Sequence, residues 1–246
     1  MINNMARLDT LLKDFSPNGA TFNDQILRDS AVAVAETFEN IDFESVLVGG
    51  KAAEILYYHS GHSRGSDDMD FILAPFMRKS EFSELVSKPI IEKLDDRYNI
   101  TTSKKRFRYG IKVNSDDEQG IDLNFLTKSK GYLSDTSDTN QTWREIRNAR
   151  MIQIPHTNTQ IKTYRPEDII AWKLYNYDQP RAKDWYDIKL VLDIYHDKID
   201  RTYLRTAIID QINYQINHKE KRDHSISPSF EAQLIINKLM RPIKSR

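Results

Sequence analysis

An alternation of acidic and apolar residues in DMDFILA, residues 68–74, predicts a β-strand with two unlike faces. Successive side chains of a strand point to opposite faces, so Asp68 and Asp70 share one face while Met69 and Phe71 share the other. The apolar face must be covered, whereas two carboxylates side by side raise the cost of ionising each other. Either a cation lies between the acids, or the segment is a solvated turn whose pattern is accidental.

The residues before this strand predict a strand, a glycine turn and a helix. The short β-branched run ESVLV, residues 44–48, ends in Gly49 and Gly50, and residues 51–60 have apolar positions at helical spacing. Glycines at such a turn let the backbone approach a phosphate, and the helix N-terminus offers free N–H groups. The same pair is also compatible with simple turn chemistry.

A third acid is expected on a nearby strand. The alternating runs 104–113 and 120–128 flank the turn-rich segment NSDDEQ and predict an antiparallel hairpin. In the second run the apolar neighbours of Asp122 would face the core, which leaves Asp122 and Asn124 on the opposite face. Three carboxylates from two neighbouring strands can hold one or two divalent cations. The predicted ligands of magnesium or manganese are Asp68, Asp70 and Asp122.

The rest of the chain predicts a mixed and then a helical part. Helices are expected over 23–40, 79–98, 166–177, 182–196, 202–217 and 229–239, and short strands over 151–154 and 161–164. Pro89 is expected to kink or break its helix. Residues 129–142 are polar throughout and predict a loop. The expected fold class is α/β (α+β): a small mixed sheet flanked by helices in residues 1–160, and a mostly helical subdomain in residues 161–246.

Composition excludes several classes of protein. The chain of 246 residues can bury a full core, and its lack of cysteine excludes disulfides, thiolate catalysis and cysteine-bound zinc. No apolar run approaches the ~20 residues of a membrane span, and no signal-peptide core is visible, so a cytoplasmic setting without membrane partners is expected. Residues 1–142 hold 17 Lys and Arg against 23 Asp and Glu, and residues 143–246 hold 19 against 13. This asymmetry would suit an acidic catalytic half beside a basic half that holds a polyanion, or it arises by chance.

In this order the motifs resemble the polymerase-β-type nucleotidyltransferase superfamily, and within it the AbiEii-type abortive-infection toxins. The resemblance rests first on VLVGGKAAEILYYHSGHSRGSDDMDFIL, residues 46–73. That branch typically shows Gly-Gly, a short helix, and then Arg-x-Ser/Thr-x-Asp-Ile/Leu-Asp-Phe. The matching residues here are Arg64, Ser66, Asp68, Met69, Asp70 and Phe71. Met69 replaces the commoner Ile or Leu, and Lys51 stands where a small hydroxyl residue is usual.

A second stretch, residues 164–193, carries the same resemblance, which spans roughly residues 44–195. The branch places a lysine on one helix and an Arg-x-Lys-Asp-x-x-Asp segment at the start of the next. The matching residues are Lys173, Arg181, Lys183, Asp184 and Asp187. By resemblance Lys173 meets the triphosphate and stabilises the departing pyrophosphate, and Asp184 acts as acid/base or holds a basic partner. Alternatively, Lys173 is a solvated helix residue, and the acids complement the positive end of a helix.

The resemblance implies a transferase that moves a nucleotide from an NTP, its substrate, to an acceptor hydroxyl and releases pyrophosphate. The implied nucleotide-binding residues are Gly49, Gly50, Lys51, Arg64, Ser66 and Lys173, and the implied catalytic residues are Asp68, Asp70, Asp122, Lys173 and Asp184. In the resembled branch the enzyme is the toxin of a toxin–antitoxin pair, its acceptor can be tRNA or another RNA, and its partner is an antitoxin or co-encoded regulator. Two alternatives stay open: an acceptor that is a small molecule or a protein, and a non-catalytic nucleotide-binding interaction protein.

The run 104–113 is also notably basic. If it is one regular strand, Lys104, Arg106, Arg108 and Lys112 share a face beside the predicted acids. Such a face would contact nucleotide phosphates or an RNA backbone. The alternative is an ordinary solvated sheet face.

Overall fold

The structure is a computed structural model that describes residues 19–62, 65–75, 77–105, 108–117, 119–127, 141–175, 181–218 and 228–240. These residues fall into two compact units, one within residues 16–165 and the other from Pro166 onward. The first unit contains the sheet, and the described part of the second consists of helices and their connections.

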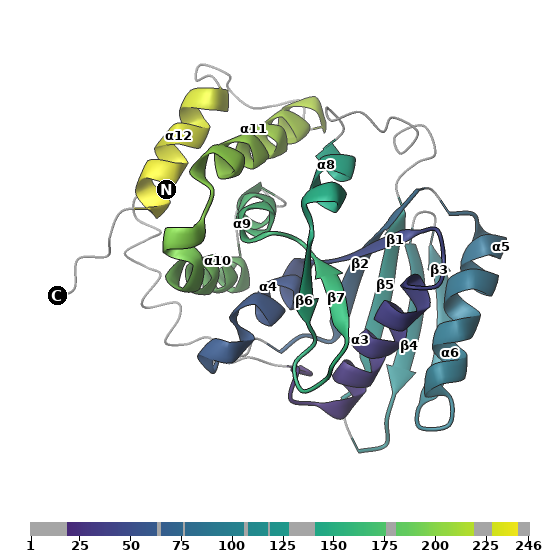
Figure 1. The fold of residues 1–246 in the computed structure, drawn as a ribbon. Coiled ribbons are helices and arrows are strands. Elements are labelled where there is room, and N and C mark those ends of the chain that lie inside the picture. The colour runs from purple at the N-terminus through teal and green to yellow at the C-terminus, as the bar shows by residue number, and fades with distance from the viewer. Residues whose placement is uncertain are drawn as a thin grey trace. The chain divides into compact units, whose positions relative to one another are not determined.

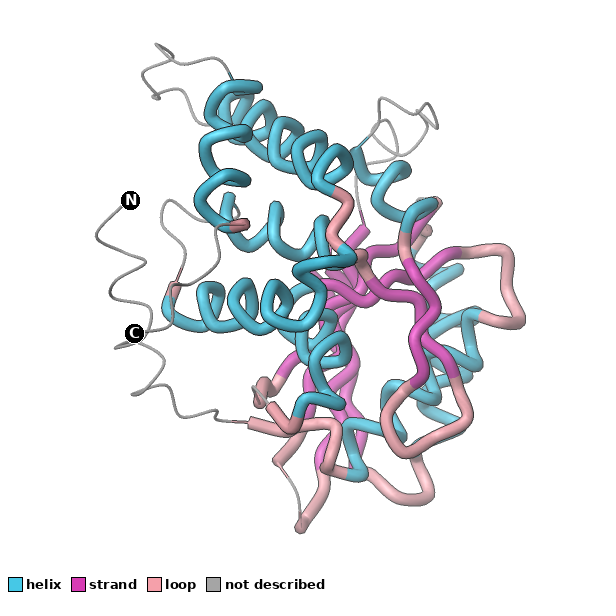
Figure 2. The backbone as a smooth tube through the Cα atoms, turned by 60° about the vertical axis from the view of Figure 1, so that its left-hand side comes forward, coloured by secondary structure: helices cyan, strands magenta, loops and turns pink. Residues whose placement is uncertain are grey.

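The first unit is built around a mixed seven-stranded sheet of order β3-β4-β5-β2-β1-β7-β6. The pairs β2–β5 and β1–β7 are parallel, and the other neighbours are antiparallel, as Figures 1 and 2 show in outline. The strands are β1 (Glu44–Val48), β2 (Asp68–Ala74), β3 (Asn99–Lys105), β4 (Arg108–Asn114), β5 (Ile121–Thr127), β6 (Arg150–Gln153) and β7 (Gln160–Thr163). The predicted fold class, a mixed sheet flanked by helices, is confirmed.

Helices cover the apolar face of this sheet. Phe38 of α3 (Gln25–Phe38) stacks on Phe125 of β5, with ring centroids 6.4 Å apart. Phe82 of α5 (Lys79–Phe82) lies 5.2 Å from Phe125 and 4.3 Å from Tyr109 of β4, between ring centroids. The other buried residues on this side include Met69, Phe71 and Leu123. The acid–apolar alternation of residues 68–71 therefore does separate a core face from an opposite face, as the sequence predicts.

The helical stretch around Pro89 changes its hydrogen-bonding pattern ahead of the proline. A π-helical turn, η2 (Ser83–Ser87), separates α5 from α6 (Lys88–Leu94), and Pro89 lies in the first turn of α6. Proline has no backbone N–H to donate and its ring clashes with the preceding turn, so the regular α-helical ladder cannot continue through it. The helical stretch continues through Pro89 with a π-helical turn ahead of it, and the structure does not show the predicted break.

Two local expectations differ from the structure between residues 49 and 148. The helix α4 (Gly49–Tyr57) begins at Gly49 itself instead of after the glycine pair, and the 3-10 turn η1 (Tyr58–Ser60) follows it. The sequence predicts a loop up to Thr142, whereas α8 (Gln141–Asn148) begins at Gln141. Most of that predicted loop, residues 128–140, lies outside the described residues.

The basic run 104–113 forms parts of two strands instead of one. β3 ends at Lys105, β4 begins at Arg108, and the register pairs these two residues. Because the chain reverses direction between them, the prediction of one regular strand with a continuous basic face is wrong. Arg106 lies outside the described residues, as does the side chain of Lys104, which leaves Arg108 and Lys112 on β4. The predicted hairpin between β4 and β5 is present.

The second unit contains α9 (Pro166–Tyr175), α10 (Ala182–Tyr195), the 3-10 turn η3 (His196–Lys198), α11 (Arg201–His218) and α12 (Pro228–Leu239). α9 packs against α10 and α11, and α11 packs against α12. Buried acids of α9 fasten the start of α11: Glu167 accepts from the Asp200 N–H at 2.8 Å, and Asp168 accepts from the Tyr203 hydroxyl at 3.1 Å. β7 pairs with β1, so the helical unit begins at Pro166 instead of near residue 160.

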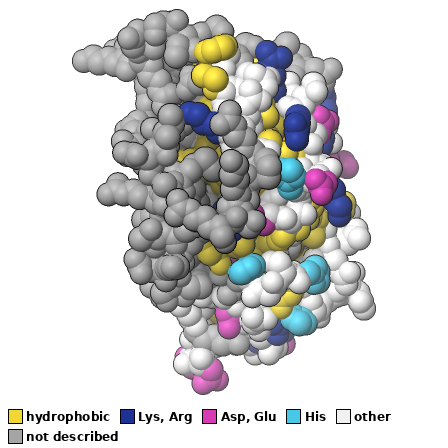
Figure 3. Space-filling model, turned by 90° about the vertical axis from the view of Figure 1, so that its left-hand side faces the viewer, with side chains coloured by type: hydrophobic (Ala, Val, Ile, Leu, Met, Phe, Trp, Pro, Cys, Tyr) yellow, Lys and Arg dark blue, Asp and Glu magenta, His cyan; other side chains and the backbone are white. Residues whose placement is uncertain are grey.

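No helix in the described ranges combines the length and the apolar character that a membrane crossing requires. On the face drawn in Figure 3, lysine and arginine side chains lie among acidic ones. The charge asymmetry of the sequence therefore does not form a field of one sign on that face.

Candidate active site

Three predicted acids lie together on the sheet face opposite the α3 and α5 contacts. In the parallel β2–β5 pair, Asp68 is the register partner of Asp122, and Asp70 is the partner of Asn124. Partners in register point to the same face. The two pairs therefore lie next to each other on that face, and these four side chains are called the block below. Asp68 and Asp122 are exposed, and Asp70 is half-buried. The sequence places all three carboxylates on this face correctly.

The glycine turn reaches the same block. Gly49 has a φ of +71°, and a Cβ placed on it would lie 3.3 Å from Oδ2 of Asp70. Val48, directly before it, is the register partner of Asp70 in the antiparallel β1–β2 pair. The N-terminus of α4, with Gly49 and Gly50 as its first residues, therefore lies beside Asp70. Free N–H groups at a helix N-terminus favour a bound anion.

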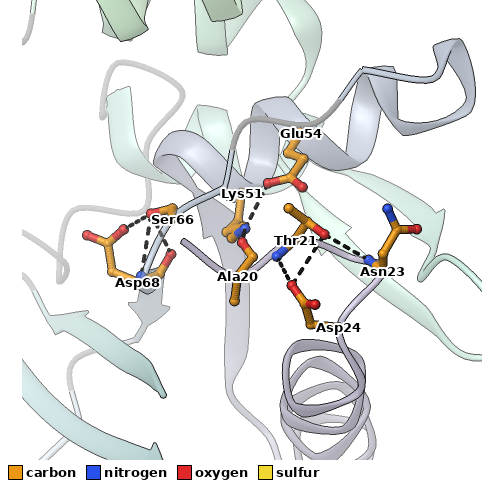
Figure 4. A network of polar contacts seen from close by, with 8 residues as sticks. All are labelled: Ala20, Thr21, Asn23, Asp24, Lys51, Glu54, Ser66 and Asp68. Carbon is orange, nitrogen blue, oxygen red and sulfur yellow. Dashed lines mark hydrogen bonds and ion pairs between the residues drawn. The ribbon is translucent and has the colours of Figure 1, made fainter. Parts of the chain in front are cut away.

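The loop before β2 holds Asp68 by a short contact network, drawn in Figure 4. The Ser66 hydroxyl donates to Oδ1 of Asp68, and the Asp68 N–H approaches Ser66 Oγ at 3.4 Å. The neighbouring Asp67 accepts from the Gln119 side-chain amide at 2.5 Å through Oδ1, and its carbonyl accepts from the Asp122 N–H at 2.6 Å. These bonds join the start of β2 to the start of β5. Arg64, predicted to bind the nucleotide, lies outside the described residues.

Cations of β4 flank the acids. The Arg108 guanidinium donates through Nε to Oδ1 of Asn124 at 2.9 Å, and its Nη2 lies 3.9 Å from Oδ1 of Asp70. Lys112, which is exposed, is the register partner of Asp122. Opposite charges within this range favour the ionised form of a carboxylate. The basic residues that share a face with the acids are thus these two.

Lys51, predicted to contact a phosphate, is turned into the protein. Its side chain is 0% exposed, and its ammonium donates to Oε2 of Glu54 at 2.8 Å and to the Ala20 carbonyl. The Phe22 ring centroid lies 5.8 Å from the same nitrogen. An ammonium enclosed in this way does not fit the predicted phosphate contact, so we assign Lys51 a structural position.

The donor chemistry at the block fits a hard divalent cation better than a soft one. The available groups are carboxylate oxygens, which magnesium, manganese and calcium prefer, and neither cysteine nor histidine is among them. Among the described residues, however, no group of three or more His, Cys, Asp or Glu side chains is gathered as a formed metal site. The acids share a face and a register without converging on one point.

The second predicted motif forms a buried charge cluster in the helical unit. Lys173 of α9 is 2% exposed, and its ammonium lies 3.3 Å from Oδ1 of Asp184 and 2.6 Å from Oδ2 of Asp187, both on α10. Arg181, at the N-cap of the same helix, donates to Oδ2 of Asp184 from its guanidinium at 2.8 Å and from its backbone N–H at 3.1 Å. The alternative of a solvated lysine is therefore wrong, because Lys173 is enclosed by the two predicted acids.

Burial on its own would raise the pKa of Asp184, since a carboxylate is disfavoured away from water. The hydrogen bond from Arg181 and the positive charges of Lys173 and Arg181 together outweigh that effect and lower the pKa of Asp184 below the ordinary value of an aspartate. Asp184 is accordingly held in its ionised form.

Sequence reasoning missed two functional candidates on the acid face. Asn124 is 5% exposed, and its side-chain Nδ2 has no hydrogen-bond partner among the described residues. Arg108 reaches it across the β4–β5 pair, although the sequence indicates only that Arg108 is one of several basic residues. The signal that could have found Asn124 is its position two residues after Asp122, on the same strand face.

Comparison with known proteins places the chain in a family. A family model described as "Nucleotidyl transferase AbiEii toxin, Type IV TA system" matches residues 26–244. A search of curated proteins gives no significant match. An antigenic nucleotidyltransferase-like protein from Paracoccidioides brasiliensis is similar in structure at 13% identity and a TM-score of 0.47, over 87% of this chain and 95% of that one.

Two further solved structures are similar over shorter parts of the chain. The lincosamide antibiotic adenylyltransferase LnuA is 16% identical with a TM-score of 0.36, over 65% of this chain and 92% of that one. A cytoplasmic RNA terminal U-transferase is 11% identical with a TM-score of 0.32, over 60% of this chain and 43% of that one. The family match covers most of the sequence, including both motif stretches. The chain therefore belongs to the AbiEii nucleotidyl transferase toxin family of type IV toxin–antitoxin systems and is a nucleotidyltransferase.

Proposed function

We propose that the block of Asp68, Asp70 and Asp122 is the catalytic centre of a metal-dependent nucleotidyl transfer to an acceptor hydroxyl. One observation carries the proposal. The three acids occupy one face of two adjacent strands, beside a helix N-terminus that opens on Gly49, in a member of a nucleotidyltransferase family. Like charges in neighbouring positions raise the cost of ionisation unless a cation is shared, so the arrangement favours a divalent ion.

Each residue has a specific task in the proposed site. Asp68, Asp70 and Asp122 would hold the metal ions, and Asp122 would also accept a hydrogen bond from the acceptor hydroxyl. The N-terminus of α4, at Gly49 and Gly50, binds phosphate oxygens through backbone N–H groups. Bound magnesium or manganese supplies charge neutralisation and polarises the α-phosphoryl group.

The reaction proceeds as an in-line displacement. The acceptor oxygen forms a bond to the α-phosphorus of the NTP, and the bond from that phosphorus to the bridging oxygen of the β-phosphate breaks. The hydroxyl proton is lost to a carboxylate or to water, and pyrophosphate leaves with the bridging oxygen. The electrostatic part of catalysis is the stabilisation of charge on that leaving group.

We infer further that Lys173 and Asp184 serve the same reaction. The support is their match to the family pattern, with a lysine followed by Arg-x-Lys-Asp-x-x-Asp. Lys173 would stabilise the departing pyrophosphate, and Asp184 would hold that lysine in place, as the 3.3 Å contact between them allows.

An RNA acceptor, with tRNA as the first candidate, fits the surroundings of the acids. Arg108 and Lys112 lie beside Asp70 and Asp122 on the same sheet face, and cations near such a site favour a phosphate backbone. The toxin description of the family favours a co-encoded antitoxin as the protein partner.

The test is a transfer assay with each of the four NTPs, labelled at the α-phosphate, with magnesium and total RNA. Label in RNA supports the proposal, and label in tRNA alone identifies the acceptor. Label in a small molecule or in protein would replace the RNA acceptor and keep the carboxylate site. No label in any fraction under conditions in which the protein is folded would contradict the transferase centre itself.

A further inference from the structure

A buried lysine lies behind the proposed metal ligand Asp68. Lys51 of α4 is 0% exposed in its side chain and pairs with Glu54 at 2.8 Å, one turn further along the helix. Its second contact is the backbone carbonyl of Ala20, in the segment that precedes α3. Lysine is almost never fully buried unless it is paired, so this position demands an explanation.

The Ala20 carbonyl links the lysine to the loop before β2. It accepts from the Ser66 N–H at 3.0 Å as well as from the Lys51 ammonium. The two segments are in direct contact, because a Cβ placed on Gly19 would lie 2.5 Å from Oδ1 of Asp67 and 2.8 Å from the Ser66 nitrogen. Residues 19 and 20 are thus held between α4 and the loop.

From Ser66 the chain of contacts continues to the acid. The Ser66 hydroxyl donates to Oδ1 of Asp68, the carboxylate proposed to hold a metal ion. Figure 4 shows the two ends of this path, the contacts of Lys51 with Glu54 and Ala20 and those of Ser66 with Asp68, and the bond from the Ser66 N–H to the Ala20 carbonyl joins them. A change in the position of the lysine would therefore be transmitted to the Asp68 carboxylate.

Burying this ion pair carries a large desolvation cost. Both side chains are fully buried, and Oε1 of Glu54 has no hydrogen-bond partner among the described residues. Replacing a buried ion pair by apolar residues of similar size is often neutral or stabilising. If the pair contributes only to stability, apolar residues of similar size can replace it without loss. If the pair holds the geometry of the loop, the same replacement will disturb the loop.

We propose that Lys51, held by Glu54, is a positioning residue that sets the orientation of Asp68 through Ala20 and Ser66. The proposal rests on the proposed function, since it takes Asp68 as a metal ligand. Residues that hydrogen-bond a metal ligand, as Ser66 does with Asp68, typically contribute 10–100-fold to metal affinity or activity, and Lys51 would act through this bond.

The decisive variant is the double substitution Lys51→Met and Glu54→Leu, which removes both charges and keeps similar volumes. We expect unfolding stability at or above that of the wild type, with Mn²⁺ affinity and transfer rate each reduced by about 10–100-fold. The matched control is Lys162→Met with Glu44→Leu, which removes a 2.7 Å ion pair between β7 and β1 that is partly exposed. The control should leave the Mn²⁺ dissociation constant and the transfer rate unchanged.

A second pair of variants keeps the proposal testable if the double variant does not fold. Ser66→Ala removes the last link of the path without touching the buried charges, and Ser66→Thr retains the hydroxyl. We expect weaker Mn²⁺ binding for Ser66→Ala and restoration by Ser66→Thr.

Unchanged Mn²⁺ affinity and transfer rate in the folded double variant, or in Ser66→Ala, would overturn the positioning role while the proposed function stands. A wild-type protein that neither binds Mn²⁺ nor transfers a nucleotide would instead overturn the proposed function. The two failures are thereby distinguished.

Discussion

Asp68 and Asp122 lie exposed side by side on the sheet, whereas Asp184 and Asp187 are buried around Lys173 in the helical unit. Asp68 and the two helical acids match the family pattern, and Asp122 is the register partner of Asp68, but the fold supplies cations to the two pairs differently. In the helical unit Lys173 and Arg181 are within ion-pair distance of the acids, so the charges balance within the protein. On the sheet the guanidinium of Arg108 lies 3.9 Å from Oδ1 of Asp70.

The two regions differ in what neutralises their negative charges. A balanced buried cluster is a condition for folding, since removing one partner leaves an uncompensated charge away from water. Neighbouring exposed acids do not contribute to stability, because they repel each other. In the proposed site bound metal ions would compensate them. Substitutions at the sheet should therefore affect activity with little effect on stability, whereas substitutions in the helical cluster should lower stability as well as activity.

The largest expected effect is at the sheet. Asp70→Ala should reduce nucleotide transfer by about a thousandfold, since a metal ligand supplies several kcal/mol to the transition state. The melting temperature should stay within a few degrees of the wild type, because a half-exposed repulsive charge is lost. The control Asp116→Ala removes an exposed acid from the loop between β4 and β5 and should leave transfer unchanged. A wild-type rate of nucleotide transfer in folded Asp70→Ala would contradict the proposed site.

In the helical unit the expectation is reversed. Lys173→Met leaves Asp184 and Asp187 buried without their lysine and should lower the free energy of unfolding by about 3–5 kcal/mol. Urea denaturation measures this loss. Lys189→Met is the matched control, because it breaks an exposed ion pair with Asp193 on α10 and should cost less than about 1 kcal/mol. Equal losses of unfolding free energy in the two variants would show that the buried cluster contributes no more to stability than an exposed ion pair.

Two glycines with similar backbone conformations test whether the turn before α4 contributes to the site. Gly49 and Gly61 have φ of +71° and +80°, so alanine at either should destabilise the protein by about 1–2 kcal/mol. A Cβ at position 49 meets Asp70 at 3.3 Å, whereas one at position 61 meets nothing within 4 Å. Gly49→Ala should therefore lower transfer activity as well as stability, and Gly61→Ala only stability. Equal activities of the two variants would contradict a role for the turn in the site.

The smallest expected effect is on the stability of the folded protein at acidic pH. The pKa of Asp184 is lowered on folding, so the unfolded chain takes up a proton at this group more readily than the folded one. The contribution of Asp184 is complete above the unfolded pKa and is lost as the pH falls below 3.8 through the folded pKa. Asp184→Asn should flatten the fall of stability in that range, as followed by urea denaturation at several pH values. A fall as steep as that of the wild type would mean that other groups dominate acid unfolding.

Much of the sheet and its acid face follows from sequence periodicity. The strict alternation around Asp68 and Asp122 fixes which face each side chain takes, and a face is set by neighbours two residues apart. The predictions for Asp68, Asp70 and Asp122 could therefore be made without knowing which strands pair. The parallel register that places Asp68 beside Asp122 depends on long-range packing, which the pattern does not contain.

The errors have physical causes of the same kind. Lys51 follows two glycines on a predicted helix, and nothing local indicates that its ammonium would reach Ala20, 31 residues earlier in the chain. Lys105 of β3 pairs with Arg108 of β4, yet the sequence between them contains none of the Gly, Asn or Pro signals of a hairpin. α8 begins in a polar stretch whose composition favours a loop.

The most direct measurement is the Mn²⁺ dissociation constant of the wild type and of Asp122→Asn, followed by electron paramagnetic resonance in the presence of a non-hydrolysable NTP analogue. Asp122 lies on a different strand from the other two acids, so its participation tests whether register neighbours act as one site. We expect Asp122→Asn to weaken Mn²⁺ binding by at least about tenfold, with the fold intact. Wild-type Mn²⁺ affinity in folded Asp122→Asn would contradict a shared three-carboxylate centre.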